Sequence, residues 1–208
     1  MKSYWDFIEE MARNIGNHPY SRLNNDREFR FEKYKTNSSY PIYQYDTGDQ
    51  NVNVTKHIDN NGTIYYSTND NSSKEIIHYS NIETHKPTAK LPFKHQEQTM
   101  VERIKDNRLP KEYATNFIYN HFKSSNLPLR SSDTQYRTGH NMWRKLAHKA
   151  LDDGYRVYYH DGSQLHKSNK MNVDKHLDSS FGVETRIRGN ALPPDYEQRH
   201  IILSKKEL

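Results

Sequence analysis

Cysteine is absent from this chain of 208 residues. Disulfide bonds, thiolate metal sites and cysteine nucleophiles are therefore excluded. No window reaches the roughly 18 apolar residues that a transmembrane helix needs, and residues 1–14 lack the apolar segment of a signal peptide. We therefore expect neither a membrane-spanning protein nor secretion by that route, and a cytoplasmic location is favoured.

Charge of one sign is nowhere concentrated in the chain. Lysine and arginine number 31 against 26 aspartate and glutamate residues, which gives a net charge of +5. Because no run of five like charges occurs, the basic tail that grips nucleic acid is missing. Nucleic acid is therefore a disfavoured partner, although the mild positive charge permits an anionic one.

Apolar residues are scarce as well. They make up 32% of the chain, whereas about 45–50% is usual for soluble domains, a range that also counts glycine. The 16 tyrosines supply part of the missing apolar surface, since a tyrosine ring packs while its hydroxyl stays hydrated. We expect one thin core, helped by contacts with a partner or with a second copy of the chain.

The first half of the chain changes from helical to strand periodicity. Apolar residues at helical spacing predict a helix over 3–14, and a polar extension follows over 15–37. From residue 40 to residue 83, Tyr, Ile and Val alternate with polar residues, and turn residues occur at 60–62 and 69–71. This pattern predicts an antiparallel meander of three or four strands, whose tyrosines form either a recognition surface or a half-buried sheet face.

Strands and helices alternate in the second half. The expected elements are a polar connector over 84–98, strands over 98–106, 127–133, 155–162 and 199–207, helices over 111–125, 138–152 and 171–181, and a hairpin-like turn at Asp161-Gly162. Together the two halves predict a mixed α+β fold with one central, largely antiparallel sheet flanked by helices. Residues 1–37 are expected to form an N-terminal helix and polar extension, and 38–208 a single domain.

The helix expected over 138–152 has the widest apolar face. Thr138 is its expected cap, and Gly154 suits the left-handed position after its last turn. The apolar face is expected to pack into the core, with Trp143 at its centre. Its members are Met142, Trp143, Leu146, Ala147, Ala150 and Leu151.

The stretch around this helix has the most specific pattern in the chain. A short strand ends in Ser132-Asp133, Gly139 opens the helix that carries Trp143-x-x-Leu146, and a Val-Tyr-Tyr strand follows. With the order of elements, this pattern resembles the GCN5-related N-acetyltransferase (GNAT) family, and in particular the acetyltransferase-like proteins of tailed bacteriophages. The resemblance implies a GNAT fold, a location in the host cytoplasm or the virion, and acetyl-CoA held where two strands splay apart.

The resemblance extends roughly over residues 40–208 and implies a set of cofactor-binding residues. In that family, the pyrophosphate lies on backbone amides at a helix start, in a loop of the form Q/R-x-x-G-x-G/A. Glycine there allows close approach, and the positive end of the helix dipole attracts the anion. The implied cofactor-binding residues of this chain are Arg108, Lys111, Tyr113 and Ala114.

This loop departs from the family pattern. Its spacing is one residue longer, and both glycines are missing. Pro110 removes a backbone donor, and Glu112 places a carboxylate where the pyrophosphate would lie. Acetyl-CoA is therefore expected as cofactor only if the protein is active.

Two residues are candidates for catalysis. The family often carries Asn-x-x-Ala-x-x-x-Tyr on its fourth helix, where the tyrosine protonates the leaving thiolate; here Asn141 matches, Arg144 replaces the alanine and His148 replaces the tyrosine. The resemblance makes His148 a candidate general acid, whereas the residue pattern alone places it on the wet flank of the helix. Asp133 follows a strand end, where α/β sheets hold ligands, or it hydrogen-bonds the turn.

The 12 histidines show no metal-binding spacing. The nearest clusters are His85 with His95, and His160 with Asp161 and His166. Neither cluster has the i, i+4 helical pair with a carboxylate that a zinc hydrolase needs. We expect no metal site and histidines dispersed over the surface.

Three functions follow as hypotheses. The favoured one is a binding or structural protein on an acetyltransferase-like scaffold, docked on a protein partner or within a virion, because the strand and helix pattern is kept while the phosphate loop is broken. The second is an active N-acyltransferase that transfers an acetyl group from acetyl-CoA to an amine. The third, a nucleic-acid-associated protein, depends on positive charge alone. Fold by itself does not choose among them.

Overall fold

The structure is a computed structural model that describes residues 40–43, 52–58, 61–70, 72, 76–103, 109, 111–132, 137–181 and 199–208. Within these residues the chain forms nine strands and three helices. The expected helix over 3–14 and the extension over 15–37 lie outside them. None of the described helices is both long and apolar enough to cross a membrane.

The first five strands form an antiparallel meander. They are β1 (Tyr40–Tyr43), β2 (Val52–Ile58), β3 (Ile64–Asp70), β4 (Ile76–His85) and β5 (His95–Arg103). Each pairs antiparallel with the next. The predicted meander is confirmed with four strands, β1–β4, and β5 is the strand that was expected over 98–106, displaced toward the N-terminus. The predicted connector over 84–98 is wrong at both ends, because strand pairing of His85 with His95 shortens it to residues 86–94.

Helices and strands alternate in the rest of the chain, as predicted. The elements are α3 (Tyr113–Ser124), β6 (Leu129–Ser131), α4 (Arg137–Asp152), β7 (Arg156–Asp161), β8 (Leu165–Ser168), α5 (Val173–Phe181) and β9 (Arg199–Ser204). The turn at Asp161-Gly162 leads into β8, which pairs antiparallel with β7. β8 was not expected from the sequence, because its four residues carry no apolar alternation.

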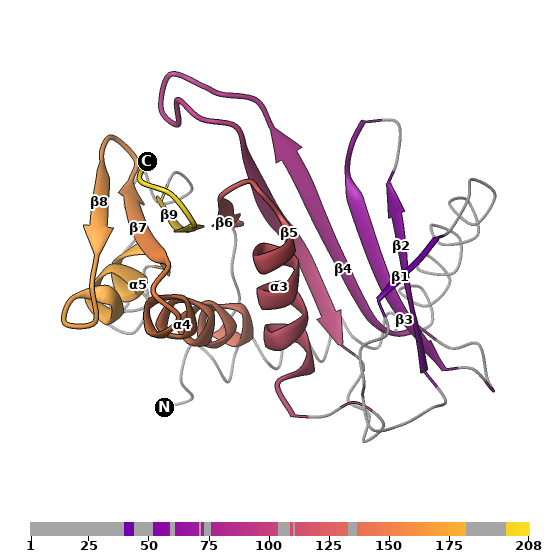
Figure 1. Ribbon diagram of the computed structural model, residues 1–208. Helices are drawn as coiled ribbons and strands as arrows, with labels where there is room; N and C mark the ends of the chain where they lie inside the picture. Colours follow the sequence, from indigo (N-terminus) through magenta and orange to yellow (C-terminus); the bar gives the residue numbers. More distant parts are fainter. Residues whose placement is uncertain are drawn as a thin grey trace, which may run out of the picture.

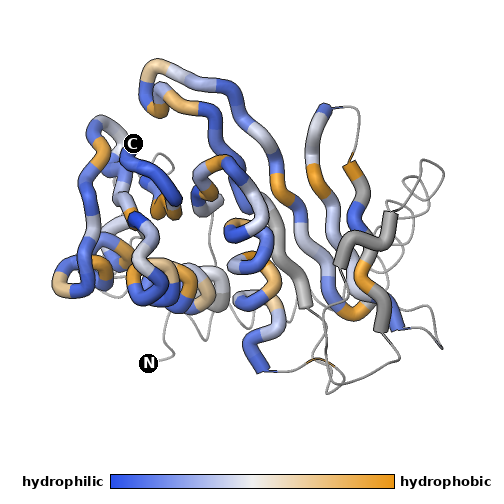
Figure 2. The backbone as a smooth tube through the Cα atoms, viewed as in Figure 1, coloured by the Kyte–Doolittle hydropathy of each residue, from blue (hydrophilic) through white to orange (hydrophobic). Residues whose placement is uncertain are grey.

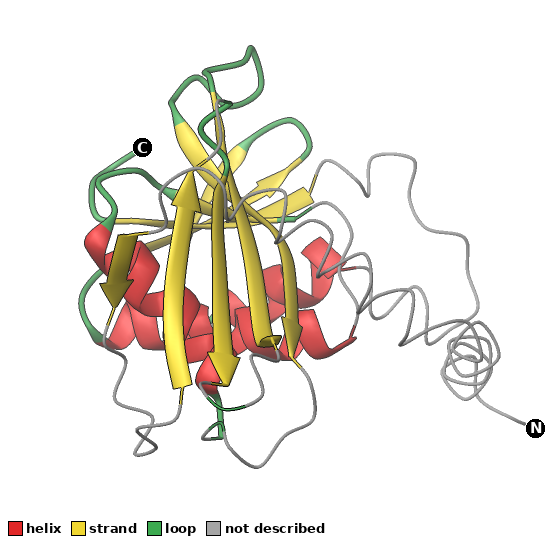
Figure 3. Cartoon of the chain, turned by 90° about the vertical axis from the view of Figure 1, so that its right-hand side faces the viewer, coloured by secondary structure: helices red, strands yellow, loops and turns green. Residues whose placement is uncertain are grey.

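All nine strands belong to one sheet, with the order β1-β2-β3-β4-β5-β6-β9-β7-β8. The pair β5–β6 is parallel and is connected through α3, whereas the other pairs are antiparallel. The last strand, β9, lies between β6 and β7. The mixed α+β class with a mostly antiparallel sheet is thus confirmed, and the three helices cover one face of the sheet (Figures 1 and 3).

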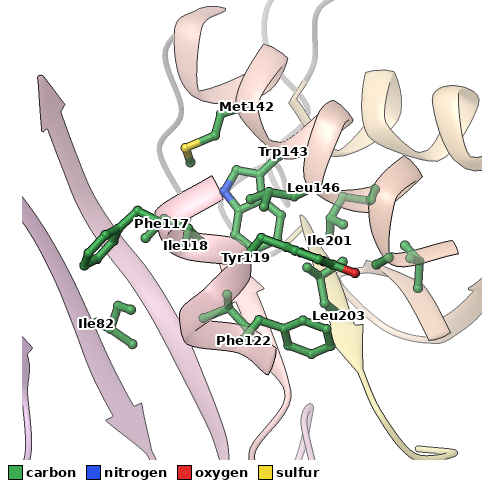
Figure 4. Close-up of a cluster of buried hydrophobic side chains, with 14 of the residues drawn as sticks. Ile82, Phe117, Ile118, Tyr119, Phe122, Met142, Trp143, Leu146, Ile201 and Leu203 are labelled. Carbon is green, nitrogen blue, oxygen red and sulfur yellow. The ribbon is translucent and has the colours of Figure 1, made fainter. Parts of the chain in front are cut away.

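The main core lies between this face and the helices. Trp143 and Leu146 of α4 and Ile118 and Phe122 of α3 are fully buried against the sheet (Figure 4). The predicted apolar face of α4 is confirmed: all its members are buried except Leu151, which is partly buried against the same core. Hydrophobic stretches are short and interrupted by polar ones along the chain (Figure 2), as expected for a thin core.

The two ends of α4 differ in how well they were predicted. Gly154 has a φ of 79°, and the Tyr155 and Gly154 N–H groups donate to the carbonyls of Ala150 (2.8 Å) and Leu151 (3.2 Å). This paired hydrogen-bond pattern with a left-handed glycine is a Schellman motif, so the predicted end is confirmed. Thr138 is not the cap, because the helix already begins at Arg137.

A second, smaller apolar cluster lies on the opposite face of the sheet. The β4–β5 loop over 86–94 bends toward β9 and β7 (Figure 1) and places Leu91 against Tyr158 and Ile202. Phe93 and Leu165 pack on this cluster. The loop therefore connects the meander to the C-terminal half of the sheet.

Candidate functional site

The parallel pair β5–β6 is paired over a short length. Gln96 lies opposite Leu129, and the pairing ends at Gln98 opposite Ser131. β6 stops there, whereas β5 continues beside β4 to Arg103. The last part of β5 therefore has no paired strand on its β6 side among the strands that the structure describes.

A β-bulge lies where this pairing ends. Asn81 pairs with Met100 and Ile82 with Gln98, which leaves Thr99 as an extra residue in β5. A bulge bends its strand and increases the local twist. Ligands of α/β sheets bind beyond the carboxyl ends of parallel strands, and α4 follows β6, which ends here. We take this end of the β5–β6 pair as the candidate site.

Trp143 of α4 lies on the helix side of this position. Its side chain is fully buried, and its indole N–H donates to Gln98 Oε1 at 3.0 Å. A buried amide oxygen without a donor costs free energy, so this bond holds Gln98 at the last paired position. Met142, one residue earlier, is also buried in the main core. Trp143 therefore occupies part of the helix side of the site.

The start of α3 is unusual for an anion site. Glu112 occupies the N-cap position with a left-handed φ of 67°, and no side chain caps the helix. Its Oε1 accepts a hydrogen bond from Lys145 Nζ at 2.5 Å. This bond and the lysine charge lower the pKa of Glu112, so the carboxylate is ionised at neutral pH. A negative charge at this helix start repels a pyrophosphate.

The implied cofactor-binding residues occupy different environments. Tyr113 is fully buried, and its hydroxyl lies 2.6 Å from Thr68 Oγ1. Ala114 is partly buried against the main core, whereas Lys111 is exposed. Arg108 lies outside the described residues. Of the three described ones, Lys111 alone presents an exposed side chain to a ligand.

The candidate catalytic residue His148 lies between two helices. It is on α4, and its Nε2 is 3.0 Å from Asp174 Oδ1 of α5. Arg144 binds Asp178 at 2.6 Å and Asp174 at 3.5 Å, so α4 and α5 are joined by a row of ion pairs. The side chain of His148 is 41% exposed, which agrees with the wet-flank position. Asp133, the other candidate, lies outside the described residues.

Histidine burial was predicted wrongly. Instead of being dispersed over the surface, six of the ten histidines whose side chains the structure describes are buried. The reason is that β-strand alternation turns them inward on the strands, and helical spacing does so on α3 and α4. The buried ones are His78, His95, His121, His140, His160 and His200. Among the described residues, no three His, Asp or Glu side chains are grouped so that they could hold a metal ion.

His121 belongs to a buried network under α3. Gln96 Oε1 accepts hydrogen bonds from Ser125 Oγ (2.7 Å) and from His121 Nε2 (2.9 Å). Since an amide oxygen only accepts, Nε2 carries the proton, and Nδ1 accepts from the Tyr66 hydroxyl at 2.8 Å. Burial lowers the pKa of His121 to about 4. The network is therefore neutral at physiological pH.

The opposite face of the sheet carries a buried ion pair. Arg130 of β6 pairs with Glu97 of β5, and both side chains are largely buried. Arg130 also donates to His200 Nε2 of β9 at 3.0 Å, and His85 of β4 lies 3.0 Å from Glu97. The ring of His200 stacks on that of His160 of β7. Burial and the Arg130 charge lower the pKa of His200 to about 3. Through these contacts, polar side chains link the five adjacent strands β4, β5, β6, β9 and β7.

Strand parity is the signal in the sequence that points to this second group. His85, His95 and Glu97 share one parity across the β4–β5 hairpin, and His160 and His200 are opposite each other in β7 and β9. That signal is usable only when the strand order is known, which is why these residues were missed.

Two comparisons of this chain with known proteins gave no match. No protein-family model matches it, and no curated protein sequence matches it. The function has to be argued from the residues and from their arrangement.

Proposed function

We propose that this protein is an acetyltransferase-like, GNAT-type scaffold that acts by binding a protein partner, as a phage-encoded component associated with a virion. The observation that carries the proposal is the start of α3. The position that would receive the cofactor pyrophosphate holds the Glu112 carboxylate, which is paired with Lys145, and Tyr113 is committed to the core. A protein that binds acetyl-CoA needs free backbone amides and positive charge at this position.

The order of elements supports the scaffold part of the proposal. A meander leads into β5, the helix α3, the parallel strand β6, the helix α4 and the last strands. This is the order expected from the resemblance, with β9 inserted antiparallel between β6 and β7. The match concerns topology, and topology alone does not select a function.

An active N-acyltransferase is the second candidate, and one observation favours it. Beyond Gln98, the backbone edge of β5 has no described strand partner, and unpaired backbone groups need hydrogen-bond partners. The amide groups of an extended cofactor arm could supply them. In that case acetyl-CoA would donate its acetyl group to an amine, and His148 or Asp133 would be the residues to test as general acid or base.

Isothermal titration with CoA and acetyl-CoA separates the two candidates. The partner-binding proposal predicts no heat of binding at millimolar CoA or acetyl-CoA. In a separate purification experiment, it predicts that the protein co-purifies with a large assembly. Micromolar binding that is lost in Arg108→Ala would overturn it in favour of the enzyme. Glu112→Gln is the matched variant: gain of CoA binding in it would show that the carboxylate is what excludes the anion.

A further inference from the structure

Two histidines from different elements lie together where α5 packs against β7. His166 is on β8, directly opposite Tyr159 of β7, and His176 is on α5. Their ring centroids are 6.4 Å apart, and both rings stack on the Tyr159 ring, at 6.0 and 5.0 Å. Spacing in the sequence groups His166 with His160 instead, but alternation along β7 places His160 on the other face of the sheet. His166 and His176 are called the histidine pair below.

A polar group holds each ring of the histidine pair through one of its two nitrogens. The Asp161 carboxylate lies 2.7 Å from His166 Nε2, and because a carboxylate only accepts, Nε2 carries the proton and Nδ1 keeps its lone pair. The Ser168 hydroxyl lies 2.7 Å from His176 Nδ1. A hydroxyl accepts as well as donates, so Nδ1 can carry the proton and leave the lone pair on Nε2. Histidines that bind metal ions are oriented in this way through their second nitrogen.

The two orienting residues are themselves fixed. Asp161 Oδ1 accepts hydrogen bonds from the N–H groups of Ser163 and Gln164, both at 2.8 Å, while Oδ2 is the oxygen that faces His166. Ser168 is 4% exposed and belongs to the β7–β8 ladder. The positions of both rings are therefore set by the fold before any ligand binds, which lowers the entropic cost of binding.

The inclination of the rings distinguishes the histidine pair from the other close histidines. The ring planes of His85 and His95 are inclined by 13°, and those of His160 and His200 by 19°. An imidazole lone pair lies in the plane of its ring, so nearly parallel stacked rings do not direct two lone pairs at one point. In the histidine pair the planes are inclined by 47°, which allows convergence, and the His166 side chain is 41% exposed.

The spacing of the histidine pair suits a transition-metal ion. A Zn–N bond is about 2.0–2.1 Å long, so two imidazoles on one zinc ion have ring centroids roughly 5–6 Å apart. A small rotation of the exposed His166 ring reaches that spacing from 6.4 Å. Imidazole nitrogen suits zinc, copper and nickel, whereas Mg²⁺ takes oxygen ligands.

We propose that His166 and His176 form an open binding site for a divalent transition-metal ion such as Zn²⁺, and that Asp161 and Ser168 orient the two rings. The two histidines supply two nitrogen ligands, and water completes the four-coordinate shell that zinc prefers. The proposal goes beyond the proposed function and does not depend on it.

The test is isothermal titration of the untagged full-length protein with ZnCl₂, and with MgCl₂ as the control ion. His166→Ala and His176→Ala each remove one ligand. The matched control is His148→Ala, which also removes an exposed histidine held by a carboxylate, that of Asp174 at 3.0 Å. The proposal predicts that Zn²⁺ binds at one site whose affinity falls at least about tenfold in both ligand variants and less than about twofold in the control. MgCl₂ should give no heat of binding, and circular dichroism verifies that the variants are folded.

Asp161→Asn tests the orientation of the ring without removing a ligand. The amide oxygen can still accept from the turn, whereas the amide N–H₂ group faces His166 Nε2 as a donor and favours the tautomer with the proton on Nδ1. Zinc affinity should therefore fall about 10–100-fold while the fold is retained. An unchanged affinity in this variant would overturn the orienting role of Asp161. No zinc binding at millimolar ZnCl₂, unchanged binding in the ligand variants, or an equal loss in His148→Ala would overturn the site itself.

Discussion

At the scale of single residues, His121 shows how a polar side chain is accommodated in a thin core. Its Nε2 donates to Gln96 and its Nδ1 accepts from Tyr66, so both nitrogens are satisfied in one neutral tautomer. A second proton would place a donor on Nδ1, against the Tyr66 hydroxyl and in a site that is 5% exposed. Protonation is therefore coupled to loss of the native packing.

We expect the stability of the protein to fall as the pH falls from 6.5 to about 4. Burial lowers the pKa of His121 from 6.5 to about 4, so the unfolded chain binds the proton first. The contribution of His121 is complete above pH 6.5 and is lost through this window; at about 1.4 kcal/mol per pKa unit it amounts to about 3 kcal/mol. Urea unfolding at neutral pH and at pH 5 measures the part of this loss that is complete by pH 5, about 2 kcal/mol.

The variant His121→Gln provides the control for this pH dependence. Glutamine does not titrate in the window, so the free energy of unfolding of the variant should change less between the two pH values. The same change in both proteins would show that other groups, such as His200, account for the pH dependence.

At the scale of elements, the end of α4 depends on one backbone conformation. Gly154 has a φ of 79°, which costs a residue with a Cβ about 1 kcal/mol or more. A Cβ at this position would meet no atom within 4 Å. The cost of a substitution is thus conformational and not steric contact with neighbours.

Gly154→Ala is expected to lower the free energy of unfolding by about 1 kcal/mol, and Gly154→Asn by less, because asparagine tolerates the left-handed region better. Urea denaturation of the two variants measures this difference. Equal stability of Gly154→Ala and the wild type would contradict the Schellman assignment.

At the scale of the whole molecule, the buried pair Glu97–Arg130 joins the two halves of the sheet. β5 is the last strand of the meander, and β6 is the first strand of the alternating half. Arg130 also donates to His200 on β9. The ion pair therefore lies where β5, β6 and β9, which come from separate parts of the chain, are neighbours in the sheet. A largely buried charge requires its partner, since removing one member leaves the other uncompensated.

Arg130→Met is expected to lower the free energy of unfolding by about 3 kcal/mol, because the Glu97 carboxylate stays buried without the guanidinium. The double variant E97M/R130M should recover a large part of that loss, since two apolar side chains then replace the pair. Chemical denaturation of the single and double variants compares them. A double variant as unstable as the single one would mean that packing, and not charge, is lost.

Local patterns predicted much of the fold and little of the site. The apolar spacing around Trp143 predicts α4, and turn residues predict the meander, because both signals lie within a few residues. β8 follows a predicted turn, but its own four residues carry no apolar alternation. The burial of Tyr113 and of the histidines depends on which strand faces which helix, and that information is not local.

The sequence by itself determined the element types, the apolar face of α4, its glycine end and the absence of thiol chemistry, since these follow from residue type and spacing. Only the tertiary structure decided that β9 lies between β6 and β7, which brings His200 to Arg130 across 70 residues of chain. It also placed Leu91 on Tyr158 and so held the β4–β5 loop against the sheet. Such contacts depend on the free energy of pairing distant segments of the chain, and the residue pattern within one segment contains no information about that free energy.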